Sequence, residues 1–352
     1  MARNITIAGR RIGHDYPPYV LAELSGNHNG DIERAFKLME AAKVTGADGI
    51  KIQTYTADTL TIDHDGPEFR IEGGLWGGHT LYSLYQEAHT PWDWHDALFA
   101  KARELDITLF STPFDATAVD FLEQLGAPAY KIASFEVVDL ALIAKAAATG
   151  KPLIISTGMA DLSEIGEAVA TAREYGSGEI VLLHCVSAYP APPEESNLKT
   201  IPHLAAAFDV AVGLSDHTPG GAVPSAAVAL GAVLVEKHMT LRRADGGPDA
   251  AFSLEPEEFR LMTESCRIAA AALGEVNYRR TASEGGSMVY RRSLYVVHDV
   301  KAGDAFSAEN VRSIRPGFGL KPKHLSSVIG RRASRDITRG TALDWAMIGE
   351  VG

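Results

Sequence analysis

A chain of 352 residues is long enough for one large core with a small second unit, since single cores rarely grow past about 250–300 residues. Hydrophobic residues make up 46% and charged residues 22%, a composition that excludes an intrinsically disordered protein. The formal net charge of −12 has the wrong sign for a protein that mainly binds nucleic acid, because phosphate contacts need clustered Lys and Arg.

The cysteines and the N-terminal segment indicate a soluble protein of the cytoplasm. Cys185 and Cys266 lie far apart, with no spacing typical of a disulfide framework or a zinc site. Residues 1–13 contain three arginines and lack the apolar stretch of a secretion signal. Because no later segment is an uninterrupted apolar span, we expect no membrane partner.

Short apolar runs rich in β-forming residues alternate with stretches of helical periodicity, eight times in all. Strands are predicted at 19–23, 49–54, 108–112, 129–134, 153–156, 180–184, 211–215 and 233–238. Helices are predicted at 32–45, 92–105, 116–125, 140–149, 162–175, 221–230 and 256–273. This order predicts an α/β protein with a (β/α)8 TIM barrel, and a doubly wound sheet is the alternative.

Two regions interrupt the alternation. Residues 55–91 form a long insertion rich in Gly, Asp and aromatics, typical of a lid or binding segment. Residues 275–288 are polar, without an apolar period, and predict a linker between a barrel domain (1–274) and a small second domain (289–352) with a strand at 293–297 and a turn at 301–304. The second domain has a net charge of +5, which suits docking on an acidic surface, contact with an anionic substrate, or a solvated basic face.

Polar residues follow every predicted strand, at the barrel face where reacting groups gather. Lys51 in DGIKIQ and Lys131 in AYKIAS are the most informative, because an unpaired ammonium inside an apolar strand costs several kcal/mol, on the order of 3–5. Each needs either a neighbouring carboxylate or a bound anion. With hydroxyl groups nearby, the two lysines predict a cradle for a small phosphate-bearing or carboxylate-bearing ligand, to which we assign Thr112, Ser134, Ser156 and Ser215.

Two histidines predict a metal site. His217 in GLSDHT and His238 in VEKHM end adjacent strands, so their imidazoles should converge at the barrel mouth. Glu23 or Asp249 could add a direct or water-mediated contact. Glu23 ends the first strand ahead of the glycine-containing SGNHNG and is the expected proton-handling residue.

Many of these motifs, taken in order, resemble the sialic acid synthase family from about residue 18 to the C-terminus. They are AELSGNHNGD, GADGIKIQTY, FSTPFD, AYKIAS, ISTGM, LLHC with YPAPPEE, VGLSDHT, and VEKHMTL with GGPDAAFSL. The tail, with SIRPGFGLKP and DITRGTAL, resembles the antifreeze-like SAF domain, a β-clip, that those enzymes carry. Within the family, LWGGHTLYSLYQEAHTPWDWH and HCVSAYPAP look most like the pseudaminic acid synthases.

The resemblance implies a transferase that condenses phosphoenolpyruvate with 2,4-diacetamido-2,4,6-trideoxy-L-altrose, using Mn²⁺ or else Mg²⁺ or Co²⁺. Sialate-forming members carry an asparagine at the position of Ser187, so its absence argues against N-acetylmannosamine, although a phosphate contact by Ser187 stays open. The alternative product is N-acetylneuraminate or legionaminate. Aromatic residues of the insertion, namely Trp76, Tyr82 and Tyr85, would suit the methyl-rich sugar.

The resemblance also implies a role for each matching residue. Phosphoenolpyruvate would be held by Lys51, Thr112, Lys131, Ser134, Ser156, Ser187 and Ser215, the ion by His217 and His238, and the sugar by Gln53, Glu136, Tyr189 and Asp249. Arg315 of the tail would reach the active site of a partner subunit, which implies a domain-swapped homodimer. Two other hypotheses are a Schiff-base aldolase with Lys131 as nucleophile and a carbohydrate-binding or ice-binding module on an inert barrel.

Overall fold

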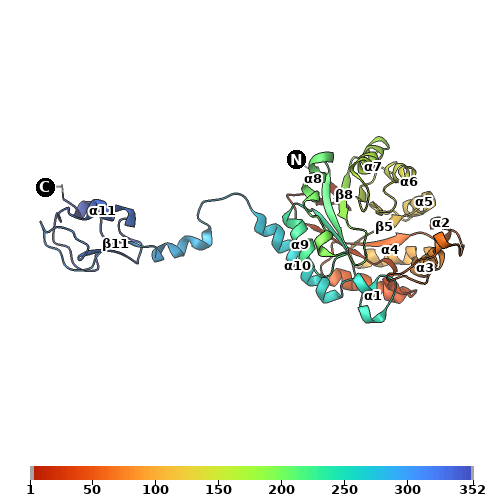
Figure 1. The fold of residues 1–352 in the computed structure, drawn as a ribbon, viewed down its shortest axis with the longest axis horizontal. Helices are drawn as coiled ribbons and strands as arrows, with labels where there is room; N and C mark the ends of the chain where they lie inside the picture. Colours follow the sequence, from red (N-terminus) through yellow and green to blue (C-terminus); the bar gives the residue numbers. More distant parts are fainter. Residues whose placement is uncertain (1–3, 350–352) are drawn as a thin grey trace. The chain divides into compact units, whose positions relative to one another are not determined.

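The computed structural model describes residues 4–349. The outer ends of the two predicted domains, residues 1–3 and 350–352, lie outside the described residues. The chain folds as two compact units that divide after Gly274 (Figure 1).

The first unit is a closed barrel of eight strands, in the order β10-β3-β4-β5-β6-β7-β8-β9. These strands are β3 (Tyr19–Glu23), β4 (Gly49–Thr54), β5 (Thr108–Pro113), β6 (Tyr130–Ile132), β7 (Leu153–Ser156), β8 (Ile180–Cys185), β9 (Ala211–Asp216) and β10 (Leu234–His238). The barrel closes where β10 runs parallel to β3, with Leu234 opposite Tyr19 and His238 opposite Glu23. The barrel prediction is therefore confirmed, and the doubly wound alternative is wrong because an open sheet has no such closing pair.

A helix follows each strand and covers the outside of the barrel (Figure 1). The helices are α1 (Ile32–Val44), α4 (His95–Glu104), α5 (Ala116–Gln124), α6 (Leu140–Ala147), α7 (Leu162–Glu174), α8 (Thr200–Phe208), α9 (Ala222–Ala229) and α10 (Pro256–Leu273). Asp31, Asp115 and Asp161 cap three of them by accepting backbone N–H groups of the first turn. Of these helices, α8 was not predicted.

The insertion after β4 is more ordered than a plain loop. It contains α2 (Ala57–Leu60), the 3-10 helix η2 (Pro67–Phe69) and α3 (Leu81–Ala88), and another 3-10 helix, η3 (Trp92–Trp94), precedes α4. Thr80 caps α3 by accepting from the Ser83 N–H. This segment crosses the C-terminal ends of the strands and brings side chains of α3 to the cavity described below.

The lower half of the barrel is a packed core. Tyr19, Leu21, Phe110, Ile154 and other inward side chains form one apolar cluster, and Ile5, Ile7 and Ile12 join it from an N-terminal hairpin that was not predicted. That hairpin pairs β1 (Ile5–Ile7) with β2 (Arg10–Ile12). Side chains alternate along a strand, so the next inward-facing position lies two residues further on. At these positions, nearer the C-terminal ends of the strands, the side chains are polar, and this end of the barrel therefore forms a site.

The second unit has its own small core and is described by itself. It contains the 3-10 helix η7 (Ala282–Tyr290), an antiparallel pair of β11 (Ser293–Val296) and β12 (Val311–Ile314), and α11 (Leu325–Val328). Leu294, Val296, Phe306 and Leu343 are among its buried side chains. The predicted linker 275–288 is partly helical, because η7 begins inside it; its residues are nevertheless largely exposed. The turn at 301–304 is present, since the Asp304 N–H donates to the Lys301 carbonyl.

Among residues 4–349, no helix combines the length and the apolar composition that a membrane span requires.

Candidate active site

A cavity of about 460 Å³ opens at the C-terminal ends of the barrel strands. It brings together most of the predicted site residues of the barrel, namely Lys51, Gln53, Lys131, Ser134, Glu136, Ser156, Tyr189, Ser215, His217, His238 and Asp249. Glu23, Thr112 and Ser187 contact these residues from just behind the cavity surface. Arg315 lies in the second unit, exposed and just after β12.

The alternation of side chains decides which polar residues enter the site. Glu236 and His238 share the inner face of β10, whereas Lys237 between them faces outward and forms a buried ion pair with Asp216. His184 also faces outward, and its Nε2 lies 2.6 Å from the Ser196 carbonyl oxygen. Polar residues at strand ends therefore fall into two groups, and only the inward group lines the cavity.

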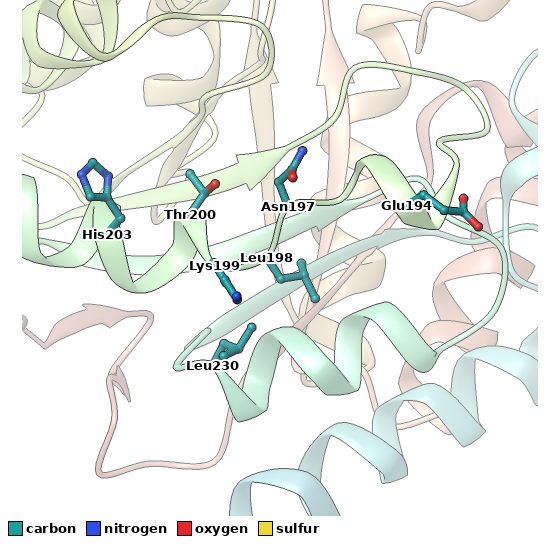
Figure 2. A pocket seen from close by; sticks show the side chains of 7 residues that line it. All are labelled: Glu194, Asn197, Leu198, Lys199, Thr200, His203 and Leu230. Atoms are coloured by element: carbon teal, nitrogen blue, oxygen red, sulfur yellow. The ribbon is translucent and has the colours of Figure 1, made fainter.

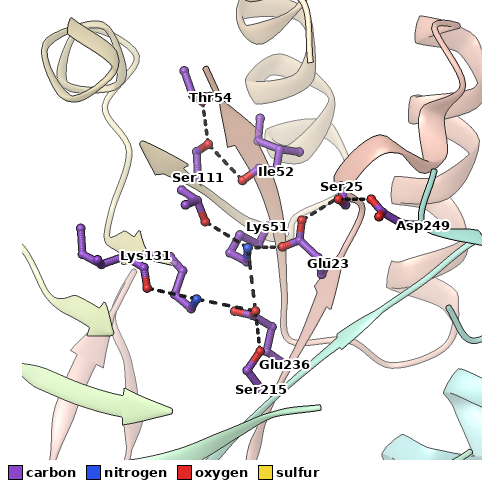
Figure 3. A network of polar contacts seen from close by, with 12 residues as sticks. Glu23, Ser25, Lys51, Ile52, Thr54, Ser111, Lys131, Ser215, Glu236 and Asp249 are labelled. Atoms are coloured by element: carbon purple, nitrogen blue, oxygen red, sulfur yellow. Dashed lines mark hydrogen bonds and ion pairs between the residues drawn. The ribbon is translucent and has the colours of Figure 1, made fainter. Parts of the chain in front are cut away.

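Lys51 is the centre of the polar network in Figure 3. Its ammonium forms an ion pair with Glu23, donates to Thr112 Oγ1 at 3.0 Å and lies 3.8 Å from Glu236 Oε1. Burial raises the pKa of Glu23 to about 7, because desolvation outweighs the attraction of Lys51. Burial disfavours the Lys51 ammonium as well, but the two carboxylates outweigh it and raise the pKa of Lys51.

Lys131 shares the same carboxylate from the other side. Its Nζ lies 3.8 Å from Glu236 Oε1, and Ser215 Oγ donates to that oxygen at 3.1 Å. Burial lowers the pKa of Lys131 despite Glu236. From the sequence, a neighbouring carboxylate or a bound anion was expected as the partner of each buried lysine. The structure shows the carboxylate, Glu236, and both lysines also line the cavity, where an anionic ligand can reach them.

Glu236 lines the cavity as well, although no role was predicted for it from the sequence. It is buried between two lysines, and its Oε2 has no hydrogen-bond partner. The signal was its spacing: two residues before His238 on a strand, it must face the same side. The contact between Glu236 and Lys51 depends on the register of β3, β4 and β10, which could not be predicted from the sequence.

The predicted hydroxyl groups gather beside Lys131. Ser134 Oγ and Ser187 Oγ lie 2.8 Å apart, and Ser156 Oγ is buried without a hydrogen-bond partner. Gly158 makes this approach possible: its φ is +50°, and a Cβ there would lie 2.4 Å from the Ser134 Cβ. A buried hydroxyl without a partner is uncommon and is suited to binding a ligand oxygen.

The two predicted metal ligands lie close together on neighbouring strands of the cavity wall. The ring centroids of His217 and His238 are 5.4 Å apart. His217 Nδ1 lies 2.9 Å from the Val186 carbonyl, which leaves Nε2 as the free nitrogen, and His238 Nδ1 is buried without a partner. Burial lowers the pKa of both imidazoles, so both are neutral and can offer a lone pair.

The carboxylates that could have joined these imidazoles are engaged elsewhere. Glu23 pairs with Lys51, and Asp249 accepts from Ser25 Oγ and, at 3.2 Å, from the Gly26 N–H. Within the described part of the chain, no group of three or more His, Cys, Asp or Glu side chains is arranged to hold a metal ion. The arrangement fits an ion held by two imidazoles with its other positions open, and a direct or water-mediated contact from Glu23 or Asp249 stays a prediction.

The outer part of the cavity is aromatic and apolar. Trp76 and Tyr85 line it, as predicted, whereas Tyr82 does not: its hydroxyl points to Asp58 at 3.3 Å. Tyr82 lies on the side of α3 that meets Asp58 of α2, so the prediction that it lines the cavity is wrong. Glu136 Oε2 is buried without a partner, and burial raises the pKa of Glu136 to about 7.

A second hollow lies on the outer surface beside α8 and the end of α9. Figure 2 shows the side chains that line it, and none of them is fully buried. They are Glu194, Asn197, Leu198, Lys199, Thr200, His203 and Leu230. With neither two lysines nor two imidazoles among these residues, the hollow lacks the chemistry that gathers at the barrel mouth.

Comparison with known proteins agrees with this geometry. The NeuB family model matches residues 38–278, and the SAF domain model matches residues 291–349. The pseudaminic acid synthase of Helicobacter pylori is 43% identical over 330 residues, which cover 93% of this chain and 96% of that protein. The N,N'-diacetyllegionaminic acid synthase of Legionella pneumophila is 37% identical, over 94% of each chain.

A solved structure gives the same fold. The N-acetylneuraminic acid synthetase of Leptospira borgpetersenii, crystallised with citrate, superposes with a TM-score of 0.73 at 31% identity, over 83% of this chain and 97% of that one. Since the family match spans more than half of the residues, the chain belongs to the NeuB family.

Proposed function

We propose that this chain is a pseudaminic acid synthase, which condenses phosphoenolpyruvate with 2,4-diacetamido-2,4,6-trideoxy-L-altrose and releases inorganic phosphate. One observation carries the proposal: two buried lysines and two neutral imidazoles line the same cavity. The sugar assignment rests on the Helicobacter pylori relative, at 43% identity against 37% for the legionaminic acid synthase. N-acetylneuraminate and legionaminate are the alternative products.

The inner part of the cavity binds phosphoenolpyruvate in this proposal. Lys51 and Lys131 supply positive charge, and hydroxyl groups donate to the carboxylate and phosphate oxygens. The hydroxyl groups are those of Thr112, Ser134, Ser156, Ser187 and Ser215. The unpartnered Ser156 Oγ and the close Ser134–Ser187 pair support this assignment.

His217 and His238 hold a divalent ion, with Mn²⁺ proposed first and Mg²⁺ or Co²⁺ as alternatives. When bound, the ion supplies Lewis-acid polarisation of the sugar aldehyde. The hydrogen bond from His217 Nδ1 to the Val186 carbonyl fixes that ring and its tautomer, as outer contacts of ligating histidines usually do.

Glu23 handles the proton transfers. C3 of phosphoenolpyruvate forms a bond to the aldehyde carbon at the expense of the C2–C3 double bond, and protonated Glu23 gives its proton to the aldehyde oxygen, which becomes a hydroxyl group. Water then adds at C2, where Glu23 orients it and takes back one proton. The new C2 hydroxyl loses its remaining proton as the C2–O bond to phosphate breaks, so C2 becomes a ketone and the phosphate leaves with that proton. A carboxyl group with a pKa of about 7, held by Lys51 and the Ser25 N–H, is well matched to this role.

The outer part of the cavity binds the sugar through Gln53, Glu136, Tyr189 and Asp249. Glu136 has an unpartnered oxygen that can accept an N–H or O–H group. The apolar side chains around it suit the methyl groups of two acetamido substituents and of a 6-deoxy carbon.

The working enzyme is proposed to be a homodimer of the cytoplasm, in which Arg315 of one copy completes the active site of the other. Exposed apolar side chains follow β6 and β7 at the barrel mouth, among them Phe135, Val138, Met159 and Leu162. The C-terminal unit of a second copy is the proposed cover for this patch, and the guanidinium of Arg315 suits an anionic substrate. Both free thiols are buried, which is compatible with a reducing compartment.

A substrate panel tests the proposed function. The protein is incubated with phosphoenolpyruvate, Mn²⁺ and several amino sugars, and released phosphate and product mass are measured. We expect phosphate release with the 2,4-diacetamido-6-deoxy sugar and a product that contains the three carbons of pyruvate. Borohydride trapping with pyruvate on Lys131, or turnover unaffected by EDTA, would instead support the Schiff-base aldolase.

The pH dependence of sugar binding tests the role of Glu136. Its pKa is raised to about 7, so it is mainly protonated at pH 6 and mainly ionised at pH 8. If the carboxylate accepts hydrogen bonds from the sugar, the sugar KM should fall by up to about tenfold from pH 6 to pH 8. Glu136→Gln should remove most of this change, while the KM for phosphoenolpyruvate keeps its own pH profile; an unaltered sugar KM profile would refute the assignment.

Complementation tests the role of Arg315. Arg315→Ala should raise the sugar KM by about tenfold or more, the usual cost of a hydrogen bond to a charged group, whereas the exposed neighbour Arg312→Ala should not. If Arg315 acts across a dimer, co-expression of Arg315→Ala with the inactive His238→Ala variant should restore about one quarter of the wild-type activity, since half of the dimers then hold one intact site. No restoration would refute domain swapping.

A further inference from the structure

The outer wall of the cavity carries a tip at residues 73–78 of the insertion, with the sequence GGLWGG. The backbone on either side is paired, since the Ile71 N–H donates to the His79 carbonyl at 2.9 Å. Within the tip, Gly73, Gly74 and Gly78 have φ values of +81°, +69° and +96°, which other residues rarely adopt. Residues 73–78 are therefore flanked by glycines, and the backbone at Ile71 and His79 is held by a hydrogen bond. This arrangement lets the tip move while the flanking backbone stays in place.

Trp76 at this tip connects separate loops of the barrel mouth. Its indole Nε1 donates to the Pro248 carbonyl at 2.7 Å, and its ring centroid lies 5.6 Å from that of Tyr189. Tyr189 in turn lies 4.3 Å from the ring of His217. Trp76 thus reaches the neighbourhood of the imidazole pair through one intervening aromatic ring.

A second connection leads from Trp76 to Glu23. Pro248 precedes Asp249, which accepts from Ser25 Oγ, and the Ser25 N–H donates to Glu23 Oε1 at 2.9 Å. The position of the indole is therefore linked to both proposed reacting regions. Lys51 and Lys131 lie deeper in the cavity. The hydrogen bond and the ring contact described for the Trp76 indole go to Pro248 and Tyr189, and not to these lysines.

The part of the cavity wall built by the insertion and the segment after β5 is largely apolar. Its apolar members are Leu60, Ile71, Trp76, Leu81, Leu84, Ala88 and Phe114, and Tyr55 and Tyr85 add hydroxyl groups. A sugar hydroxyl pressed against the apolar members would lose its hydrogen bonds to water, whereas a methyl group would not. This wall therefore favours a sugar with methyl groups on the edge that faces the insertion.

We infer that Trp76 is a specificity-determining residue for the amino sugar, and that its hydrogen bond to Pro248 latches the 73–78 tip over the bound sugar. The inference rests on the proposed condensation of phosphoenolpyruvate with an amino sugar, but not on which sugar is used. Phosphoenolpyruvate occupies the deeper site, so the latch acts on the second substrate alone.

Three variants test the latch with whichever sugar of the panel the wild-type protein uses best. Trp76→Phe keeps an aromatic ring and removes the donor, and it should raise the sugar KM by about fivefold, the usual effect of one hydrogen bond. Trp76→Ala should raise it by about 50-fold or more, because the apolar contact is also lost. Leu75→Ala is the control, since Leu75 is 48% exposed and does not line the cavity.

The KM for phosphoenolpyruvate should stay unchanged in all three variants, a pattern that general loss of structure would not give. Trp76→Ala should also reduce the preference for the best sugar of the panel over the other sugars, measured as the ratio of kcat/KM values. Sugar added to the wild-type protein should change tryptophan fluorescence, and Trp76→Phe should lose this change. Wild-type kinetics in both Trp76 variants, or equal rises in both KM values, would overturn the latch. Failure of the wild-type protein to use any sugar would instead overturn the proposed function.

Discussion

Replacing His238 by alanine is expected to abolish phosphate release while the barrel stays folded. His238 is buried at the cavity wall, its Nδ1 has no partner, and its ring faces His217 at 5.4 Å. Because the imidazole makes no hydrogen bond to the protein through Nδ1, its removal leaves no buried group unsatisfied there. His217 and His238 are the two protein ligands proposed for the ion. Losing one of them should weaken Mn²⁺ binding by about 100-fold or more.

The measurement pairs phosphate release with direct Mn²⁺ binding, followed by the loss of the free-ion electron paramagnetic resonance signal. His184→Ala is the matched control: His184 is also buried near a strand end, but it faces outward and contacts the Ser196 carbonyl. It should lower stability and keep Mn²⁺ binding. Phosphate release by His238→Ala at the wild-type rate would remove the metal hypothesis.

Much of the barrel could be predicted because its strands repeat one simple pattern. Parallel strands covered on both faces are short continuous apolar runs, and those at 19–23, 49–54 and 153–156 matched β3, β4 and β7 end for end. The N-terminal hairpin was missed because its strands are only three residues each, too short to show a period. Within the insertion, α2 and η2 were not predicted because they span only four and three residues, too few to show a period.

The site was predictable in its residue types but not in its pairings. Lys51, Lys131, His217 and His238 stood out because each is costly to bury without a function. That Lys51 pairs with Glu23 and shares Glu236 with Lys131 depends on the register of three strands, which no local pattern specifies. Side-chain direction explains Tyr82 in the same way: a helix of eight residues gives too little periodicity to say which face meets the cavity.

Glu236→Gln is expected to cost about 3–5 kcal/mol of the free energy of unfolding, the usual effect of breaking a buried charge pair by removing one partner. The carboxylate lies 3.8 Å from both ammonium groups, and all three side chains are almost completely buried. Without it, Glu23 remains the only carboxylate that pairs with Lys51 in the described residues, and Lys131 keeps no ion-pair partner there. Urea unfolding of the wild-type and variant proteins measures the difference. Glu257→Gln is the control, because Glu257 forms an exposed pair with Arg260 at 2.6 Å and its loss should leave the free energy of unfolding nearly unchanged.

The same variant distinguishes a structural ion pair from an anion site. If the lysines also bind the phosphate of phosphoenolpyruvate, inorganic phosphate should replace part of the lost negative charge and raise the melting temperature of Glu236→Gln more than that of the wild-type protein. Chloride at equal ionic strength controls for screening, which acts on exposed charges and much less on buried ones. No shift with phosphate in either protein would mean that Lys51 and Lys131 serve the barrel alone, and the phosphoenolpyruvate cradle would then have to lie elsewhere at the mouth.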